Sequence, residues 1–344
     1  MSVTKEPFGN EYTLYTITNE KGTQAKVTDL GGTLVSLLLQ DKNETMRDVV
    51  LGYDTPEEYR ANGFFFGAWV GRSGNRIDKA KFELDGKVWQ LPVNDNENNL
   101  HSGLEYFHLR RAQVTACTEN SVTFEIQDAH LRQGFPGNFT GTVTYTLTDD
   151  NTLKLKYTAQ CDQDTVCNMT NHSYFNLGGH DSGSILDTQL WMSCEAYTPV
   201  IDAQAIPTGE IRPVAGSAFD FTSPRTIGRD IEADDEQLAF GGGYDHNFVI
   251  RKDKGEVVRF AEAYQPKTGI CMEVYTDLPG VQLYVGNFIT KHKGKGAAEY
   301  DYRGGFCMET QYYPNSINQE GFAKPVLKAG QKFESVTCYK FSVR

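Results

Sequence analysis

The chain has 344 residues, of which 39% are hydrophobic and 23% are charged, and this balance excludes an intrinsically disordered protein. Its formal net charge of −12 disfavours partners that carry phosphate backbones or anionic surfaces, so neither nucleic acid nor a membrane is expected to bind it. The length would allow two domains, although large β folds also form single domains. Because no linker or break in composition divides the chain, we expect one domain over residues 1–344.

Strands joined by tight turns are predicted from the first residues onward. Residues 11–31 alternate apolar and polar side chains on either side of a short turn. A short helix is predicted over residues 55–62, because its first two residues suit a helix cap and first turn. Residues 79–91 form the next predicted hairpin, with Asp85 and Gly86 at its turn, because that dipeptide tolerates positive φ angles.

The same pattern continues to the end of the chain. Residues 141–160 predict another hairpin, and strand pairs are predicted within residues 270–288 and 331–344. A second short helix is predicted over residues 230–238. Since strands do not alternate with helices of 10 to 15 residues, a parallel α/β sheet is disfavoured. The sequence therefore predicts an all-β fold, a large antiparallel β-sandwich with a few short helices.

No pattern in the sequence points to a cofactor or a metal. The chain has no dinucleotide-binding fingerprint and no C-x-x-C pair that could bind zinc or act in redox chemistry. It also has no run of about 18 apolar residues, and no apolar segment follows the first charges. We expect a cytoplasmic protein with free thiols, no cofactor and no bound metal. The seven cysteines are Cys117, Cys161, Cys167, Cys194, Cys271, Cys307 and Cys338.

Five short segments are rich in polar side chains that a core built of strands would exclude. Each combines His, Arg, Asp or Glu with glycine, asparagine and apolar residues, a composition typical of strand ends and loops that hold functional groups. Taken singly, none of them identifies a function. They are GRSGNRI (71–77), NNLHSG (98–103), TNHSYFNLGG (170–179), GYDHNF (243–248) and METQYYPNSIN (308–318).

Together, these segments resemble the motifs of the galactose mutarotases (aldose 1-epimerases), and the resemblance extends along most of the chain. The family patterns G-R-x-x-N-R-I, N-H-[ST]-Y-F-N-L and D-H-[NT]-[FY] are intact at residues 71–77, 171–177 and 245–248. The late E-T-Q pattern begins at Glu309. Several ordered motifs of this kind make the match specific, and the family has a galactose mutarotase-like supersandwich fold.

Two of the family patterns are present with a substitution. Residues 279–288 match P-G-x-Q-x-Y-T-G-N except that Val285 stands where threonine is common. Residues 98–103 match N-x-L-H-G-G except that Ser102 stands in place of the first glycine. Because Ser102 follows a motif histidine, its side chain could narrow the site or face solvent.

The resemblance implies an isomerase that interconverts the α and β anomers of a free hexose such as galactose or glucose. This reaction removes a proton from the C1 hydroxyl and delivers one to the ring oxygen, after which the open chain rotates and recloses. One base and one acid suffice, and a carboxylate and an imidazole suit neutral pH. By the resemblance, Glu309 is the base and His172 is the acid. With ordinary pKa values, Glu309 would produce the acid limb of the pH profile and His172 the alkaline limb.

The resemblance also assigns residues that bind the sugar. His101 is expected beside the ring oxygen or a neighbouring hydroxyl, and Arg72 and Asp245 are expected to bind other hydroxyls. Without such roles, Arg72 would form an ion pair that holds a loop and Asp245 would cap a turn. Asn75 and Gln311 are expected at the substrate or behind the groups that touch it. Further residues that could orient these groups or pack on the sugar are Arg76, Asn171, Asn176, Tyr174 and Phe175.

Three other functions fit parts of the pattern. A non-catalytic carbohydrate-binding module would keep Arg72 and Asp245 but would need neither Glu309 nor His172. A hexose-6-phosphate 1-epimerase would need additional cations for the phosphate, a role that Arg76 could fill. A polysaccharide-active enzyme would use two carboxylates, and the motifs show no obvious second acid near Glu309.

Overall fold

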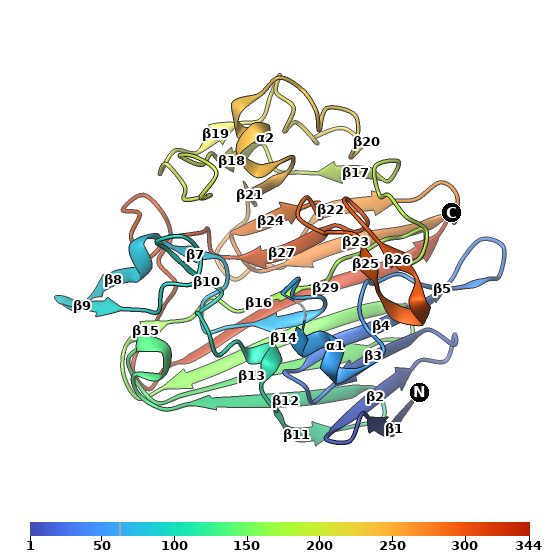
Figure 1. Ribbon diagram of the computed structural model, residues 1–344, viewed down its shortest axis with the longest axis horizontal. Coiled ribbons are helices and arrows are strands. Elements are labelled where there is room, and N and C mark those ends of the chain that lie inside the picture. Colours follow the sequence, from blue (N-terminus) through green and yellow to red (C-terminus); the bar gives the residue numbers. More distant parts are fainter. Residues whose placement is uncertain (62) are drawn as a thin grey trace.

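The computed structural model describes residues 1–61 and 63–344, and antiparallel strands are the predominant secondary structure among them (Figure 1). This confirms the predicted all-β class. The largest sheet has nine strands, in the spatial order β11 (Gln113–Cys117), β12 (Ser121–Asp128), β13 (Phe139–Leu147), β14 (Thr152–Cys161), β29 (Lys332–Val343), β23 (Ile270–Thr276), β22 (Val258–Tyr264), β17 (Gln189–Met192) and β20 (Arg225–Thr226).

Two sheets of five strands accompany the large sheet. The first is an N-terminal meander of β1 (Ser2–Phe8), β2 (Tyr12–Thr18), β3 (Gln24–Thr28), β4 (Thr33–Gln40) and β5 (Met46–Asp48). The second is formed late in the chain, in the order β19 (Arg212–Pro213), β18 (Ala196–Thr198), β21 (Asp245–Val249), β24 (Gly280–Tyr284) and β27 (Cys307–Gln311).

Shorter elements complete the fold. The two-stranded pairs are β6 (Ala68–Val70) with β16 (Thr170–His172), β7 (Arg76–Ile77) with β10 (Asn99–Leu100), β8 (Lys81–Leu84) with β9 (Lys87–Gln90), β15 (Thr165–Val166) with β28 (Val326–Leu327), and β25 (His292–Lys293) with β26 (Glu299–Tyr300). The helices are α1 (Pro56–Ala61), α2 (Glu236–Gly241) and the 3-10 turns Asp78–Ala80, Phe107–Leu109, Arg132–Gly134 and Lys295–Ala297.

One cluster of buried apolar side chains forms the core and draws on all three large sheets. Strand β13 shows the reason most clearly, because every second residue from Phe139 to Leu147 is buried. Alternate residues of a strand point to opposite faces, so this period places one face in the core. Side chains such as Val27 from β3, Val143 from β13 and Val281 from β24 meet in the same cluster.

The predicted hairpins of the first half are confirmed, and their turns have the expected backbone. Asp85 and Gly86 both have positive φ, 54° and 73°, between β8 and β9. Asn151 has a φ of 62° at the turn between β13 and β14. Glycine and the short polar residues adopt this left-handed conformation more easily than other residues, which is why the sequence located these turns correctly.

The predicted strand pairs near the C-terminus are wrong. Within residues 270–288, β23 pairs with β22 and β29, whereas β24 pairs with β21 and β27. The chain therefore passes from the nine-stranded sheet to a five-stranded sheet at residues 277–279. Residues 331–344 hold the single strand β29, which lies between β14 and β23. It contains no glycine, proline, asparagine or aspartate that could form a tight turn and fold it back on itself.

The first predicted helix is confirmed as α1 over Pro56–Ala61, and the last predicted position, residue 62, lies outside the described residues. The second begins later than predicted, at Glu236, because the Asp235 carboxylate accepts hydrogen bonds from the N–H groups of Gln237 and Leu238. Gly242, with a φ of 64°, ends this helix. None of the helices in the described ranges is long and apolar enough to cross a bilayer.

Strands β6, β16, β24 and β27 are buried on both faces. In β27, Met308 belongs to the core cluster and its carbonyl accepts a hydrogen bond from Tyr339. Since side chains alternate along a strand, Cys307, Glu309 and Gln311 point to the opposite face. This strand therefore carries polar groups into an enclosed region on the far side of the core.

Candidate active site

A cavity of about 160 Å³ lies against β7, β16, β21, β24 and β27. It brings together residues from all five motif segments, which are far apart in the chain. A larger hollow of about 530 Å³ is lined by exposed residues such as Lys42 and Glu44 and contains no histidine, so it lacks an acid–base pair. The residues lining the smaller cavity are Gly63, Phe64, Phe65, Asn75, Arg76, Leu100, His101, His172, Tyr174, Asp245, Tyr284, Phe288 and Glu309.

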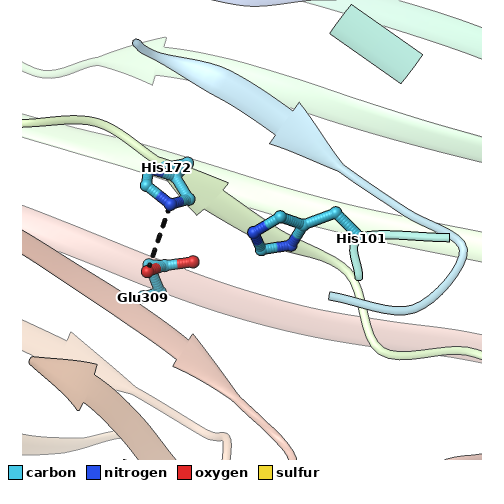
Figure 2. Close-up of side chains that lie close together, drawn as sticks. All are labelled: His101, His172 and Glu309. Carbon is cyan, nitrogen blue, oxygen red and sulfur yellow. Dashed lines mark ion pairs between the residues drawn. The ribbon is translucent and has the colours of Figure 1, made fainter. Parts of the chain in front are cut away.

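The two predicted catalytic residues meet at this cavity. His172 Nε2 lies 3.5 Å from Glu309 Oε1, and the two residues come from the adjacent strands β16 and β27 (Figure 2). Only 2% of the Glu309 surface is exposed. Its other oxygen, Oε2, is buried and has no hydrogen-bond partner among the described residues. A buried acceptor without a partner is costly, so this oxygen is available for a donor that enters the cavity.

Burial shifts the pKa values of this pair in opposite directions. Burial raises the pKa of Glu309 well above its usual value, Asp245 raises it further, and Arg76 opposes the shift. Burial lowers the pKa of His172 to about 4, against a smaller contribution from its own backbone carbonyl. Both shifts favour the neutral forms, because charged groups lose their hydration in a dry site. The pair therefore shares one proton, and the ordinary order of the two pKa values does not hold.

His101 lies beside this pair with its protonation fixed by the backbone. Its ring centroid is 5.4 Å from that of His172 (Figure 2). The N–H of Asn75 donates to His101 Nδ1 at 3.1 Å, which leaves the proton of the neutral ring on Nε2. Burial lowers the pKa of His101 well below its usual value, and His172 and Arg76 add to this shift. His101 is therefore a neutral hydrogen-bond donor, oriented by the main chain of Asn75.

Arg76 and Asp245 supply the charged groups on the cavity wall. Arg76 Nε donates to Asp95 Oδ2 at 2.7 Å, which fixes the guanidinium at the edge of the cavity. Asp245 Oδ1 accepts from Gln282 Nε2 at 2.8 Å, and Gln311 Nε2 donates to Gln282 Oε1 at 3.4 Å. Gln311 is fully buried behind the cavity, so it acts on Asp245 through Gln282.

The structure corrects the expected role of Arg72. This side chain is 1% exposed and does not line the cavity. Its Nε donates to Asp128 at 3.3 Å, and its terminal nitrogens donate to the carbonyls of Pro136 at 2.8 Å and Gly137 at 3.1 Å. Arg72 is thus the ion pair that holds a loop. The second arginine of the motif, Arg76, takes the place at the cavity that was expected of the first.

Of the remaining residues singled out from the sequence, some line the cavity and others do not. Tyr174 lines the cavity, whereas Phe175 packs in the core with its ring 4.9 Å from that of Tyr339. Ser102 turns away from the cavity, because its hydroxyl accepts from Ser73 N at 2.8 Å and donates to Ser73 O at 3.0 Å. The Ser102 hydroxyl therefore links the loop that contains His101 to the loop that contains Arg72 through two hydrogen bonds.

Several cavity residues, and one residue that orients them, were not predicted from the sequence. Phe65, Tyr284 and Phe288 line the cavity, and Gln282 orients Asp245. Three of the four lie in the motif at residues 279–288, which was used only as evidence of family resemblance. Phe65 has a φ of 60°, unusual for a bulky residue, and nothing in the sequence signals this backbone.

The acid–base cluster also has the donor types that bind transition metals. One ligand atom from each of His101, His172 and Glu309 lies within 4.8 Å of the others. Two imidazole nitrogens and a carboxylate oxygen suit a zinc ion, provided that the three side chains move closer together. Independence from metal therefore stays a prediction, which can be tested by adding and removing zinc.

An antiparallel β-sandwich whose cavity holds a buried carboxylate–imidazole pair defines an enzyme that moves protons on a small polar molecule. The model of the aldose 1-epimerase family matches residues 13–340. The chain belongs to this family. It is therefore an isomerase, and its reaction is the interconversion of the α and β anomers of an aldose.

Known relatives agree with this placement over most of the chain. The galactose mutarotase of Sus scrofa is 40% identical over 314 residues, which cover 91% of this chain and 89% of that protein. The aldose 1-epimerase of Escherichia coli is 35% identical over 338 residues, which cover 97% and 96%. The solved structure of the GalM/aldose epimerase homologue from C. elegans has a TM-score of 0.88 at 29% identity and covers 99% of both chains.

Proposed function

We propose that this cavity binds a free hexose such as galactose or glucose and that Glu309 and His172 carry out the two proton transfers. Glu309 removes the proton of the C1 hydroxyl while His172 delivers a proton to the ring oxygen, which breaks the bond between C1 and the ring oxygen. The chain then rotates about the bond between C1 and C2. The ring recloses on the other face of the aldehyde, with the two protons returned along the reverse path.

The neutral forms of Glu309 and His172 are compatible with this chemistry. The single shared proton can lie on Glu309 or on His172, and the state with an ionised Glu309 and a protonated His172 is the reactive tautomer. A hydroxyl that donates to the partnerless Oε2 of Glu309 stabilises the carboxylate, since hydrogen bonds to the charged form favour it. Substrate binding therefore shifts the pair toward the reactive state.

The other cavity residues position the sugar. His101, a fixed donor, hydrogen-bonds to the ring oxygen or to a neighbouring hydroxyl. Arg76 donates to hydroxyl oxygens and Asp245 accepts from hydroxyl groups, so the two recognise complementary sides of the same diol. Asn75 acts by orienting His101, and Gln311 acts by orienting Gln282.

The alternative functions are less well supported by the geometry. A phosphorylated sugar requires cations, yet Arg76 is the only permanent cation among the described residues lining the cavity, and it is already paired with Asp95. Asp245 is a second carboxylate at the cavity, contrary to expectation, but a volume of about 160 Å³ is small for a polymer chain. A binding module has no use for a buried His172–Glu309 pair.

One observation carries the residue assignments: His172 and Glu309 lie 3.5 Å apart in a cavity where the Oε2 atom of Glu309 has no hydrogen-bond partner within the described part of the chain. The test is polarimetry on freshly dissolved α-galactose and α-glucose, with and without protein. We expect wild type and the exposed control Glu299→Gln to accelerate the approach to equilibrium, and Glu309→Gln to lose most of this effect. Equal activity of Glu309→Gln and wild type would refute the assignment of the base.

We also propose that residues 1–344 act as one domain in the cytoplasm. The continuous core, which draws side chains from all three large sheets, supports one domain. The net charge of −12 disfavours attachment to anionic membrane surfaces, which is compatible with a cytoplasmic location. Limited proteolysis tests the first proposal, since one domain yields no stable fragment of half the length. Fractionation of cells tests the second.

A further inference from the structure

The turn that presents His101 to the cavity has an unusual backbone. Three consecutive residues after β10 have positive φ: His101 at 53°, Ser102 at 71° and Gly103 at 91°. Only glycine adopts this left-handed conformation without a steric cost, because in other residues the Cβ atom comes too close to the backbone. Two non-glycine residues in a row therefore need contacts from outside the turn to hold them in this conformation.

Ser102 makes such a contact on the side of the turn that faces away from the cavity. Its hydroxyl accepts a hydrogen bond from Ser73 N at 2.8 Å and donates one to Ser73 O at 3.0 Å. Both residues are buried, with 1% of Ser102 and 4% of Ser73 exposed. Loss of the hydroxyl would take a partner from a buried N–H and from a buried carbonyl, which is costly for both groups. One side chain thus fastens the turn at two backbone atoms.

His101 is attached to the same segment at a second point. Its N–H donates to Asn75 O at 3.1 Å, and Asn75 N donates to His101 Nδ1 at 3.1 Å. Both of these bonds go to one residue, so the turn could still pivot about Asn75. The contact between Ser102 and Ser73 removes this freedom, because it holds the turn at a separate position along the segment. The two attachments together fix the direction in which the His101 ring points.

The segment that contains Ser73 is itself anchored to the strand that carries Glu309. Asn168 N donates to Arg72 O at 2.7 Å, and Gly74 N donates to Asn168 O at 2.7 Å. The side chain of Asn168 bonds in turn to the backbone of Tyr312, the residue that follows β27, at 2.8 and 3.1 Å. None of these bonds uses the Arg72 side chain. They give the segment a fixed position relative to β27.

We infer that Ser102 is a positioning residue whose hydroxyl fixes the His101 turn relative to Glu309 and thereby sets where the His101 ring donates its hydrogen bond in the cavity. This inference rests on the proposed role of His101 at the sugar. Ser102 is not one of the described residues that line the cavity, so it acts through His101. Small displacements of a group that holds the substrate lower the rate, because the reacting atoms lose their alignment.

The direct test is amide hydrogen exchange at Asn75, measured by NMR on ¹⁵N-labelled protein. In wild type, we expect slow exchange, because this N–H donates to the buried Nδ1 of His101. Ser102→Ala loses two buried hydrogen bonds and keeps the strained backbone, so the turn opens more easily. We expect exchange at Asn75 to become roughly 5- to 150-fold faster in this variant.

Thr268→Val is the matched control. It also removes a buried hydroxyl that bonds to two backbone groups, the carbonyl of Leu177 at 2.8 Å and the N–H of Ile270 at 3.3 Å. These groups belong to a different part of the fold and do not line the cavity. We expect Thr268→Val to leave both the exchange at Asn75 and kcat/KM unchanged. The control therefore separates a general loss of stability from loosening of the His101 turn.

A double-mutant cycle tests whether Ser102 acts through His101. We expect Ser102→Ala to lower kcat/KM roughly 3- to 10-fold in the wild-type background, the worth of one neutral hydrogen bond. In the His101→Ala background, the same substitution should change kcat/KM by less than about 2-fold, because the ring that it positions is already absent. An equal loss in both backgrounds would refute the positioning role.

The outcomes separate this inference from the proposed function. Wild-type exchange at Asn75 in Ser102→Ala would overturn the inference while leaving His101 at the sugar. If wild type accelerates no anomer exchange, the proposed function fails, and the exchange at Asn75 still tests the contact by itself. Should Ser102→Ala not fold, Ser102→Gly replaces it, because glycine lacks the hydroxyl and adopts a positive φ without strain. Exchange and kcat/KM of Ser102→Gly that both equal those of wild type would show that the hydroxyl is not needed.

Discussion

The two arginines of the G-R-x-x-N-R-I motif should respond in opposite ways to truncation. Arg72→Ala removes one partner of a buried ion pair and leaves the carbonyls of Pro136 and Gly137 without their donors. Breaking a buried pair in this way costs about 3–5 kcal/mol. Asp128 keeps its ion pair with Arg110 at 2.6 Å. The loss of stability in Arg72→Ala should therefore lie toward the lower end of this range.

This cost converts into a thermal shift. An unfolding entropy of roughly 2.1 cal/mol/K per residue gives roughly 0.7 kcal/mol per kelvin for 344 residues. We therefore expect Arg72→Ala to lower Tm by about 4–7 °C while kcat/KM of the folded protein stays near wild type. Arg76→Ala removes a side chain that reaches the cavity, so we expect Tm to change little. Losing a hydrogen bond from a charged donor costs about 1.5–3 kcal/mol, and kcat/KM should fall roughly 10- to 150-fold.

The assay pairs differential scanning calorimetry with polarimetric kcat/KM on the same preparations. Arg251→Ala, whose side chain is 78% exposed, is the control for loss of a surface arginine. The reasoning is refuted if Arg72→Ala keeps its Tm but loses activity, since Arg72 would then act on the substrate. It is refuted equally if Arg76→Ala keeps wild-type kcat/KM.

The remaining predictions concern the acid–base pair, metal and a second buried ion pair. Glu309→Gln and His172→Asn should each lower kcat roughly 10²- to 10⁴-fold with unchanged circular dichroism, and near-normal kcat in either would remove that residue from its role. Burial lowers the pKa of His172 to about 4 and raises the pKa of Glu309. We therefore expect kcat/KM to decrease when the pH drops below about 4, because the pair then takes up a second proton. We expect it to decrease again at alkaline pH, because the pair then loses its single shared proton. His172→Asn should abolish the acid limb and keep the alkaline one; retention of the acid limb would contradict the pKa order. A chelator should leave kcat unchanged, whereas zinc should inhibit competitively with the sugar, and loss of activity on chelation would show a resident metal. Lys295→Met removes the ammonium group that lies 2.6 Å from the Asp48 carboxylate. We expect it to lower the free energy of unfolding, measured with denaturant, by about 3–5 kcal/mol. A smaller loss in the Asp48→Asn/Lys295→Met double variant would confirm that the unpaired charge of Asp48 is responsible.

Local sequence was sufficient for the strands and for the early hairpins, and its motifs contained the two residues that meet at the cavity. The alternation of β13 and the turn at Asp85 and Gly86 are properties of a few neighbouring residues, and the structure keeps both. Burial of one sheet face imposes a period of two on the sequence, so the all-β class is visible without coordinates. Glu309 and His172 could be named as candidates because the short motifs that contain them resemble those of a known family.

Strand pairing at the C-terminus could not be obtained in this way. Adjacent strands in sequence usually pair, yet β23 and β24 belong to different sheets. Which sheet each joins depends on core contacts with strands more than a hundred residues away, such as β14 beside β29. Local periodicity contains no information about such distant partners.

The sequence also could not show which of Arg72 and Arg76 lines the cavity. The two arginines stand four residues apart in one motif, with equal chemistry and equal spacing from glycine or asparagine. Only the folded chain places one against Asp128 and the other on the cavity wall. The pKa order of Glu309 and His172 also comes from tertiary structure, because it follows from the loss of water around both groups. The sequence alone determined which chemical groups the protein has, whereas burial and long-range packing decided which of them reach the cavity and which of their protonation states are favoured there.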